Sequence, residues 1–202
     1  MEVRTVAVIG AGAMGRSIAY AAALGDYRTI LEDILPAALR RAESEIRNHL
    51  AEAVELGAMA APAAQAALGR LEFARSVEEA ARQADLVIEA VPDELESKLE
   101  IFTLLDKICR PATILATNTS GLSVSEIASV TYRPPRCVGM RFVNPPESKR
   151  LEIVRGSQTD ESTVAAAIEM GRRMGKETVL IRERESVIGQ VRQRDTEAPR
   201  KF

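Results

Sequence analysis

Two kinds of apolar pattern alternate along the chain. Short runs rich in Val, Ile and Leu, such as the one at positions 85–91, are typical of strands that are buried on both faces. Longer stretches carry apolar residues at steps of three and four, which places these residues on one face of a helix. In the stretch 37–56 the apolar positions are Leu39, Ala42, Ile46, Leu50 and Val54.

The patterns predict strands and helices in alternation. Strands are expected over residues 6–9, 28–33, 70–74, 85–91, 112–117, 136–143, 151–154 and 178–181. Helices are expected over residues 16–24, 37–56, 77–83, 95–110, 123–130 and 161–174. The Ala-rich stretch 58–69 is interrupted by Pro62 and is either a short helix or a loop.

Strands that alternate with helices of this length indicate βαβ units. They predict an α/β fold with a doubly wound, mostly parallel sheet covered on both faces. This domain is expected to span residues 1–181, because from Arg182 onward the chain is polar and has little apolar periodicity. A segment of that kind buries too little apolar surface to offset its ordering entropy, so we expect residues 182–202 to form a frayed helix or a disordered tail.

Composition and charge narrow the classes of partner. The chain has 202 residues, of which 46% are hydrophobic and 28% charged, and its net charge of -2 gives no general attraction to nucleic acid or to an anionic membrane. No apolar run approaches the roughly 18 residues that span a bilayer, and the first residues lack the pattern of a signal peptide. We therefore expect a cytoplasmic protein with no nucleic-acid or membrane partner. Its two cysteines, Cys109 and Cys137, are expected to be reduced and structural.

A glycine pattern follows the first predicted strand. Gly10, Gly12 and Gly15 form the sequence Gly-x-Gly-x-x-Gly between that strand and the first helix. In such a turn the first glycine allows a tight reversal, the second lets a phosphate approach the backbone, and the third lets the helix pack close to the strand. The start of the helix can then bind a pyrophosphate. Ala13 and Met14 belong to the same cofactor-contacting loop, although the Met14 side chain is expected to pack in the helix.

An acid pair at the end of the second strand extends this pattern to a Rossmann-type dinucleotide site. Asp33 lies about 20 residues beyond the glycine turn, where a carboxylate can accept both hydroxyls of an adenosine ribose. Together with Glu32 it would repel a 2′-phosphate, so the sequence favours NAD over NADP. The alternative is that Asp33 only starts the next turn. No metal ligands are expected in the site.

Three further motifs, taken with the glycine turn, carry a resemblance to a known family. They are Asp85-Leu-Val-Ile-Glu-Ala-Val-Pro-Asp-Glu-Leu-Glu-Ser-Lys98, Ala116-Thr-Asn-Thr-Ser120, and Gly139-Met-Arg-Phe-Val-Asn-Pro145 followed by Leu151-Glu-Ile-Val-Arg-Gly156. In this order they resemble the L-3-hydroxyacyl-CoA dehydrogenase family, over residues 3–181. The resemblance implies a Rossmann domain that takes part in fatty acid metabolism and oxidises the 3-hydroxyl of an acyl-CoA with NAD as cofactor.

The resemblance also implies roles for single residues. Asp33 matches the family's ribose-binding acid, and Lys98 matches the lysine near the nicotinamide end of the cofactor. Asp93 stands where the family has a glutamate, which changes the reach of the acid. Ser120 matches a serine that contacts substrate and the catalytic imidazole, and Asn144 matches the asparagine that helps to hold the reacting carbonyl. Without the resemblance, Lys98 is interpreted as a solvated helix residue, and Ser120 and Asn144 as turn formers.

The sequence departs from the family at Arg141. The family has a histidine here, in a Gly-x-His-Phe-x-Asn-Pro pattern, which takes the hydroxyl proton while a nearby glutamate orients it. Glu152 matches that glutamate across a slightly shorter interval. Arginine offers donors only and cannot act as the base, so an Arg141–Glu152 ion pair is the alternative interpretation of this position. His49 is the only histidine, and on the second helix it is expected at the surface or in packing.

A second departure follows the last predicted strand. Family members continue into a helical domain that forms the dimer interface and covers the acyl-CoA. Here Glu185-Ser-Val-Ile-Gly189 stands in place of the segment that enters that domain. We therefore expect a truncated chain that has no C-terminal helical domain and no cover for the substrate.

Several functions remain open at this point. The first is an NAD-binding oxidoreductase domain of the 3-hydroxyacyl-CoA dehydrogenase type, with an acyl-CoA-like substrate and weak or absent turnover. The second is a non-catalytic nicotinamide-binding or partner subunit, in a homodimer or with another chain. The third is a damaged gene product without a selected function. The last is a dehydrogenase of another small 3-hydroxy acid, a class that shares the glycine turn but uses a catalytic lysine after a differently patterned loop.

Overall fold

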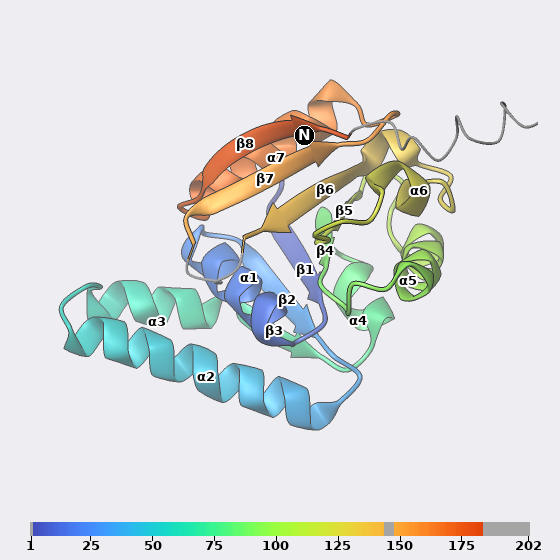
Figure 1. Ribbon diagram of the computed structural model, residues 1–202. Helices are drawn as coiled ribbons and strands as arrows, with labels where there is room; N and C mark the ends of the chain where they lie inside the picture. Colours follow the sequence, from blue (N-terminus) through green and yellow to red (C-terminus); the bar gives the residue numbers. More distant parts are fainter. Residues whose placement is uncertain (1, 144–147, 184–202) are drawn as a thin grey trace, which may run out of the picture.

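A single sheet covered by helices on both faces forms the computed structural model (Figure 1), which describes residues 2–143 and 148–183. The strands are β1 Thr5–Ile9, β2 Arg28–Glu32, β3 Leu71–Ala74, β4 Leu86–Glu89, β5 Ile114–Thr117, β6 Cys137–Phe142, β7 Arg150–Arg155 and β8 Glu177–Arg182. Their order in the sheet is β3-β2-β1-β4-β5-β6-β7-β8. Neighbouring strands are parallel except for β6 and β7, which are antiparallel. The predicted doubly wound, mostly parallel sheet is therefore confirmed.

The helices also match the predicted order. They are α1 Ala13–Leu24, α2 Pro36–Glu55, α3 Ala61–Gly69, α4 Val77–Ala81, α5 Leu95–Ile108, α6 Val124–Ala128 and α7 Glu161–Arg173, with a short 3-10 helix η1 at Pro134–Arg136. The Ala-rich stretch whose structure was open forms α3, since its proline lies in the first turn, where no N–H is needed. Figure 1 shows α3 beside α2 in a hairpin that extends from the sheet.

Two apolar cores hold the layers together. In β1, Val6 and Val8 face a core shared with α1, α2, α3 and α7, whereas Ala7 and Ile9 face a core shared with α4, α5 and α6. Because both faces of β1 are buried, its sequence is a continuous apolar run rather than an alternating one. Figure 1 shows the sheet enclosed between these two groups of helices.

The strand order places a topological switch point between β1 and β4. β1 lies between β2 and β4, so the connections after β1 and after β4 leave the sheet in opposite directions. In open α/β sheets, ligands bind in the crevice outside the carboxyl ends of the strands at such a switch point. The glycine turn follows β1, Asp33 follows β2 and Ser120 lies beyond β5. The fold therefore brings these predicted site loops together at the carboxyl ends of the parallel strands.

Part of the predicted site and tail lies outside the described residues. This applies to Asn144 and to residues 184–202 of the predicted tail. Arg182 itself ends β8, so the strand extends one residue beyond the predicted boundary at 181.

Close packing between α1 and β1 requires a glycine at position 15 of the turn but not at position 12. A Cβ built on Gly15 would lie 1.8 Å from the carbonyl oxygen of Gly10, whereas a Cβ on Gly12 would meet nothing within 4 Å. We expect Gly15→Ala to destabilise the fold by about 1–3 kcal/mol or more, because the helix must move away from the strand. Gly12→Ala should change the stability by less than about 0.5 kcal/mol. Urea unfolding followed by circular dichroism measures both variants, and equal stabilities would contradict the packing argument.

Candidate active site

The glycine turn is tied to both neighbouring strands by its backbone. The Gly10 N–H donates to the carbonyl oxygen of Glu32 on β2 at 2.9 Å, and the Ala90 N–H after β4 donates to that of Ile9 at 2.8 Å. Helix α1 begins directly after Gly12, with no side chain capping its first N–H groups and no acidic residue in its first turn. These free donors and the positive helix end form a site suited to a phosphate. The open space beside Gly12 leaves room for that phosphate to approach.

Asp33 supports the glycine turn from the end of β2. One carboxylate oxygen accepts the N–H of Ala11 and the other accepts the N–H of Leu35, each at 2.9 Å. The alternative role in starting the next turn is therefore present in the structure. It does not exclude the predicted ribose contact, because each carboxylate oxygen can accept a further hydrogen bond. Binding of the ribose stays a prediction.

Glu32 does not lie at the surface beside Asp33. It is 1% exposed, and its Oε1 atom has no hydrogen-bond partner among the residues that the structure describes. Burial raises the pKa of Glu32 to about 7, and the negative charges of Asp33 and Glu78 raise it further in the same direction. Burial keeps the Glu32 side chain from direct contact with a 2′-phosphate, and the expected repulsion of that group by Glu32 and Asp33 together stays a prediction.

Lys98 is completely buried on α5, so its interpretation as a solvated helix residue is wrong. Its Nζ donates to Glu89 Oε1 at 2.6 Å and to the carbonyl oxygen of Asn118 at 3.0 Å. Thr117 donates its hydroxyl to the other oxygen of Glu89 at 2.7 Å. Burial raises the pKa of Glu89, while Lys98 and these hydrogen bonds oppose the shift. The pair joins the ends of β4 and β5 to α5 beneath the predicted nicotinamide site.

Asp93 and Ser120 are brought together above this pair. The Ser120 hydroxyl donates to Asp93 Oδ2 at 2.7 Å and the Ser120 N–H donates to the same oxygen at 3.0 Å, while the other Asp93 oxygen lies 3.9 Å from Lys98 Nζ. Burial alone would raise the pKa of Asp93, but hydrogen bonds from Thr119 and Ser120 and the charge of Lys98 lower it overall. Three of the predicted site residues therefore form one connected group.

Arg141 is held in place by two neighbours. The antiparallel register of β6 and β7 sets it directly opposite Glu152, and its Nη1 donates to Glu152 Oε2 at 3.1 Å. Its Nε donates to the carbonyl oxygen of Thr119 at 2.9 Å. Arg150 binds the second oxygen of Glu152 at 2.8 Å. The Arg141–Glu152 ion pair is confirmed. Through Thr119, Arg141 contacts the residue that directly precedes Ser120 in the chain.

His49 lies away from this group of residues, on α2. Its ring packs edge-on against Tyr20 with 6.4 Å between the ring centroids. Together with Arg16 and Glu45, which form an ion pair of 2.5 Å, it lines a cavity of about 550 Å³ between α1 and α2. His49 is thus an exposed residue that packs against one aromatic ring, in agreement with the expected surface or packing role.

Sequence reasoning assigned no role to Glu89 and misplaced Glu32. For Glu89 a signal was present, because an acid inside a strand that is apolar on both faces needs a buried partner. For Glu32 no local signal exists, since an acid at a strand end is ordinarily solvated.

Metal binding, membrane insertion and thiol chemistry find no support among the described residues. Within residues 2–143 and 148–183, no group of His, Cys, Asp and Glu side chains could hold a metal ion. None of the helices in those ranges is long and apolar enough to cross a membrane. Cys109 and Cys137 are both free and buried, and burial raises the pKa of each thiol to about 11, so neither is a reactive nucleophile.

Breaking the buried pair should destabilise the protein. In Lys98→Met the Glu89 carboxylate loses its cation in an apolar interior, which we expect to cost about 3–5 kcal/mol of unfolding free energy. The double variant Glu89→Gln with Lys98→Met leaves no buried charge and should be more stable than the single variant. Urea unfolding measures both. If the double variant lost as much unfolding free energy as the Glu89→Gln and Lys98→Met variants lose together, the result would contradict a direct interaction between the two side chains.

Glu32 should make the stability depend on pH. Because its pKa rises from 4.5 to about 7 on folding, the folded protein retains a proton that the unfolded chain has already released between those pH values. Stability should therefore fall as the pH rises from about 4.5 to 7, by up to about 3 kcal/mol. Glu32→Gln should lose this dependence and be the more stable protein at pH 8. Parallel unfolding curves of the two proteins at every pH would contradict the assignment.

Comparison with known proteins identifies the family. The family model described as "3-hydroxyacyl-CoA dehydrogenase, NAD binding domain" matches residues 5–184. A probable 3-hydroxybutyryl-CoA dehydrogenase of Bacillus subtilis is 39% identical over 180 residues, which are 89% of this chain and 62% of that protein. A 3-hydroxybutyryl-CoA dehydrogenase of Bradyrhizobium diazoefficiens is 35% identical over 88% of this chain and 61% of that protein.

The structural comparison agrees. A crystal structure of 3-hydroxybutyryl-CoA dehydrogenase from Escherichia coli is similar with a TM-score of 0.87 and 38% identity, over 90% of this chain and 39% of that chain. The chain thus spans less than two thirds of the length of each of these relatives. Its cofactor is NAD, and it belongs to the family of NAD-binding domains of the 3-hydroxyacyl-CoA dehydrogenases.

Proposed function

We propose that this chain holds NAD across the glycine turn and Asp33 and is a weak catalyst, or none, of hydride transfer from a 3-hydroxyacyl-CoA. The observation that carries the proposal is the position of Arg141, whose guanidinium is bound by the Thr119 carbonyl and by Glu152 where the family resemblance places the base. A guanidinium has only donors and stays protonated, so it cannot accept the hydroxyl proton that must leave as the hydride is transferred.

Neighbouring carboxylates are poor substitutes for the base. Glu152 accepts hydrogen bonds from two guanidinium groups, those of Arg141 and Arg150, and these contacts occupy both of its oxygens. Asp93 has a lowered pKa and accepts the Ser120 hydroxyl, so it is a weak base as well. His49 lies on α2, outside the connected group of site residues.

An acyl-CoA is the substrate class that we propose for the ancestral chemistry of this site. The names of two relatives describe them as 3-hydroxybutyryl-CoA dehydrogenases, and the family resemblance of this sequence rests on the motifs that carry Lys98 and Ser120. The role of Asn144 toward the reacting carbonyl remains a prediction, because this residue lies outside the described part of the chain.

Separate measurements of binding and turnover test the proposal. NADH fluorescence should report binding by the wild-type chain, whereas Gly12→Ala, which keeps the fold, should bind much more weakly because its Cβ enters the space left for the phosphate. Oxidation of 3-hydroxybutyryl-CoA with NAD should be at least about 100-fold slower than for a relative with the histidine, the usual contribution of a general base. A rate equal to that of the relative would disprove the loss of catalysis.

Restoring the base alone should recover little. In Arg141→His the imidazole can accept a proton, but it acts only on a substrate that is already held in place. Among the described residues, Ser120 after β5 is the residue that the family resemblance places against the substrate. We expect the variant to remain far below the relative in the same assay, and full recovery would show that the base was the only part missing.

A second candidate function is a non-catalytic nicotinamide-binding subunit, and the exposed outermost strand of the sheet favours it. β8 is the last strand in the sheet order, and it carries Val179 and Leu180 at 40% and 48% exposure. An edge strand with apolar side chains is a template for pairing with another chain. We assign the partner as a second copy of this chain, since such pairing needs no other sequence.

The oligomeric state tests this second function. Light scattering should give a dimer for the wild type and a monomer for Val179→Lys, because a lysine on an edge strand opposes strand pairing. NADH binding by the variant should be unchanged, since β8 lies away from the glycine turn in the sheet order. A strictly monomeric wild-type protein would count against the subunit function.

The remaining alternative is less favoured. A dehydrogenase of another small 3-hydroxy acid needs a lysine that can exchange its proton with substrate. Lys98 is instead buried in an ion pair with Glu89. Its role is better explained as support for the loop that carries Asp93 and Ser120.

A further inference from the structure

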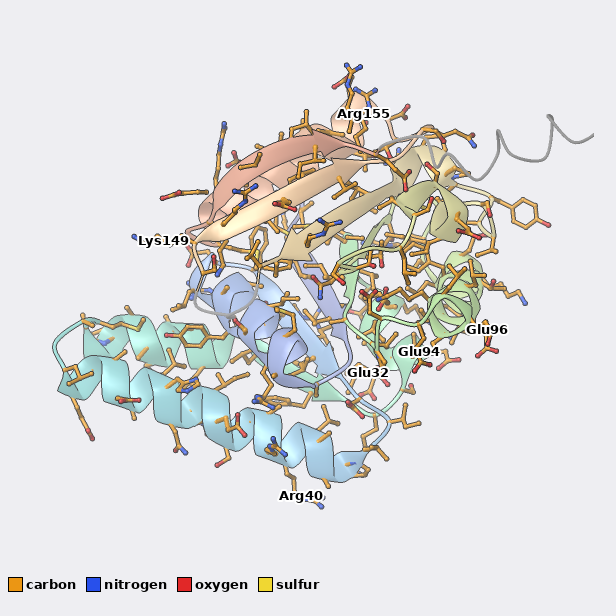
Figure 2. All side chains as sticks on the ribbon, viewed as in Figure 1. Glu32, Arg40, Glu94, Glu96, Lys149 and Arg155 are labelled. Atoms are coloured by element: carbon orange, nitrogen blue, oxygen red, sulfur yellow. The ribbon has the colours of Figure 1, made fainter. Side chains whose placement is uncertain are left out.

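Glu32 lies at the point where the cofactor site meets the sheet. It is the last residue of β2, in register with Ile9 of β1 and Ala74 of β3. Its carbonyl oxygen accepts the N–H of Gly10 in the glycine turn, and its next neighbour Asp33 accepts the N–H of Ala11. Figure 2 shows Glu32 at the same end of the molecule as Glu94, which precedes α5. An adenosine held by Asp33 would therefore cover the strand ends around Glu32.

The surroundings of this carboxyl favour its neutral form. The side chain is 1% exposed, its Oε1 has no partner, and the side chains beside it in the sheet, Ile9 and Ala74, are apolar. The charged groups that act on it are both negative. They are Asp33 on its own strand end and Glu78 on α4, and among the described residues no basic side chain contributes to its pKa. The connection between β3 and α4 contributes Arg75, whose side chain is exposed.

We propose that Glu32 is an unassigned residue of the cofactor site that takes up a proton when the dinucleotide binds. The inference rests on the proposed binding of NAD across the glycine turn. It gives Glu32 a role distinct from that of Asp33, because Asp33 would contact the ribose hydroxyls whereas Glu32 must become neutral beneath the adenosine.

Two effects of the bound cofactor drive this proton uptake. The pyrophosphate adds negative charge at the start of α1, next to the Gly10 contact, and like charges disfavour ionisation of a carboxyl. The adenosine also excludes water from the strand ends, which increases the desolvation of Glu32. In the free protein the pKa of Glu32 is about 7, so this group is partly ionised at neutral pH and has a proton to gain.

The sign of the linkage follows. Because binding raises the pKa of Glu32, the complex binds more protons than the free protein at pH values between the pKa of the free protein and that of the complex. The affinity for the cofactor is therefore highest at low pH, where Glu32 is already protonated, and it falls as the pH rises through 7. With a rise of about two pH units on binding, NADH should bind roughly tenfold or more weakly at pH 8.5 than at pH 6.

Calorimetry of NADH binding measures the proton directly. The heat is recorded at pH 7.5 in two buffers of different ionisation enthalpy, and its difference gives the number of protons exchanged. We expect uptake of about half a proton or more by the wild type and none by Glu32→Gln, whose amide imitates the neutral acid. Glu96→Gln is the matched control, because Glu96 is an exposed acid on α5 and its loss should leave the uptake unchanged.

The outcomes separate the two proposals. NADH binding without proton uptake, or with the same uptake in Glu32→Gln, would overturn the role of Glu32 and leave the NAD site intact. Failure to bind NADH at pH 6, where Glu32 is protonated, would overturn the proposed NAD binding and this inference with it. The dependence of wild-type affinity on pH needs no variant, so an affinity that is equal at pH 6 and pH 8.5 would also refute the proposal.

Discussion

The close approach of α1 to the end of β1 is the constraint on which the candidate site depends. A helix can reach this distance only where no side chain stands between the two backbones, and a Cβ on Gly15 would overlap the carbonyl oxygen of Gly10. The contact places the first turn of α1 at the carboxyl end of β1, between β2 and β4 in the sheet order, and no side chain of the described residues caps its N–H groups. Asp33 then reaches back from β2 to the Ala11 N–H, so the acid and the turn hold each other in place.

Two buried acids at the carboxyl ends of the strands, Glu89 and Glu32, have different surroundings. Glu89 is surrounded by donors from Lys98, Thr117 and the Val91 backbone, so its carboxylate is stabilised although it is fully buried. No donor among the described residues reaches Oε1 of Glu32, and the charged groups that act on its carboxyl, Asp33 and Glu78, are acids. The first arrangement gives a rigid base for the loop that carries Asp93. The second leaves a titratable group beneath the cofactor, since a lone buried carboxyl lowers its cost by binding a proton.

The substituted position in β6 separates cofactor binding from chemistry. Arg141 fills its place with good hydrogen bonds to Thr119 and Glu152, so the change from the family's histidine costs the fold little. Its chemistry is nevertheless opposite to that of a base, because it has no lone pair to offer. None of the contacts around the glycine turn involves this residue. Under the proposed function, the residues that hold the dinucleotide are therefore separate from the position at which the base is replaced.

The sequence alone determined the order and type of the elements, the glycine turn, and the acid at the end of β2. These features depend on periodicity and on local backbone requirements, which neighbouring residues carry. Only the tertiary structure decided which charged residues are buried. Lys98 has the local pattern of an exposed helix residue, but the ends of β4 and β5 enclose it, and Glu32 has that of a solvated strand end, but β1, β3 and α4 close over it. Burial depends on what packs against a residue from distant parts of the chain, and for this reason the environment of both groups could not be read from their own segments.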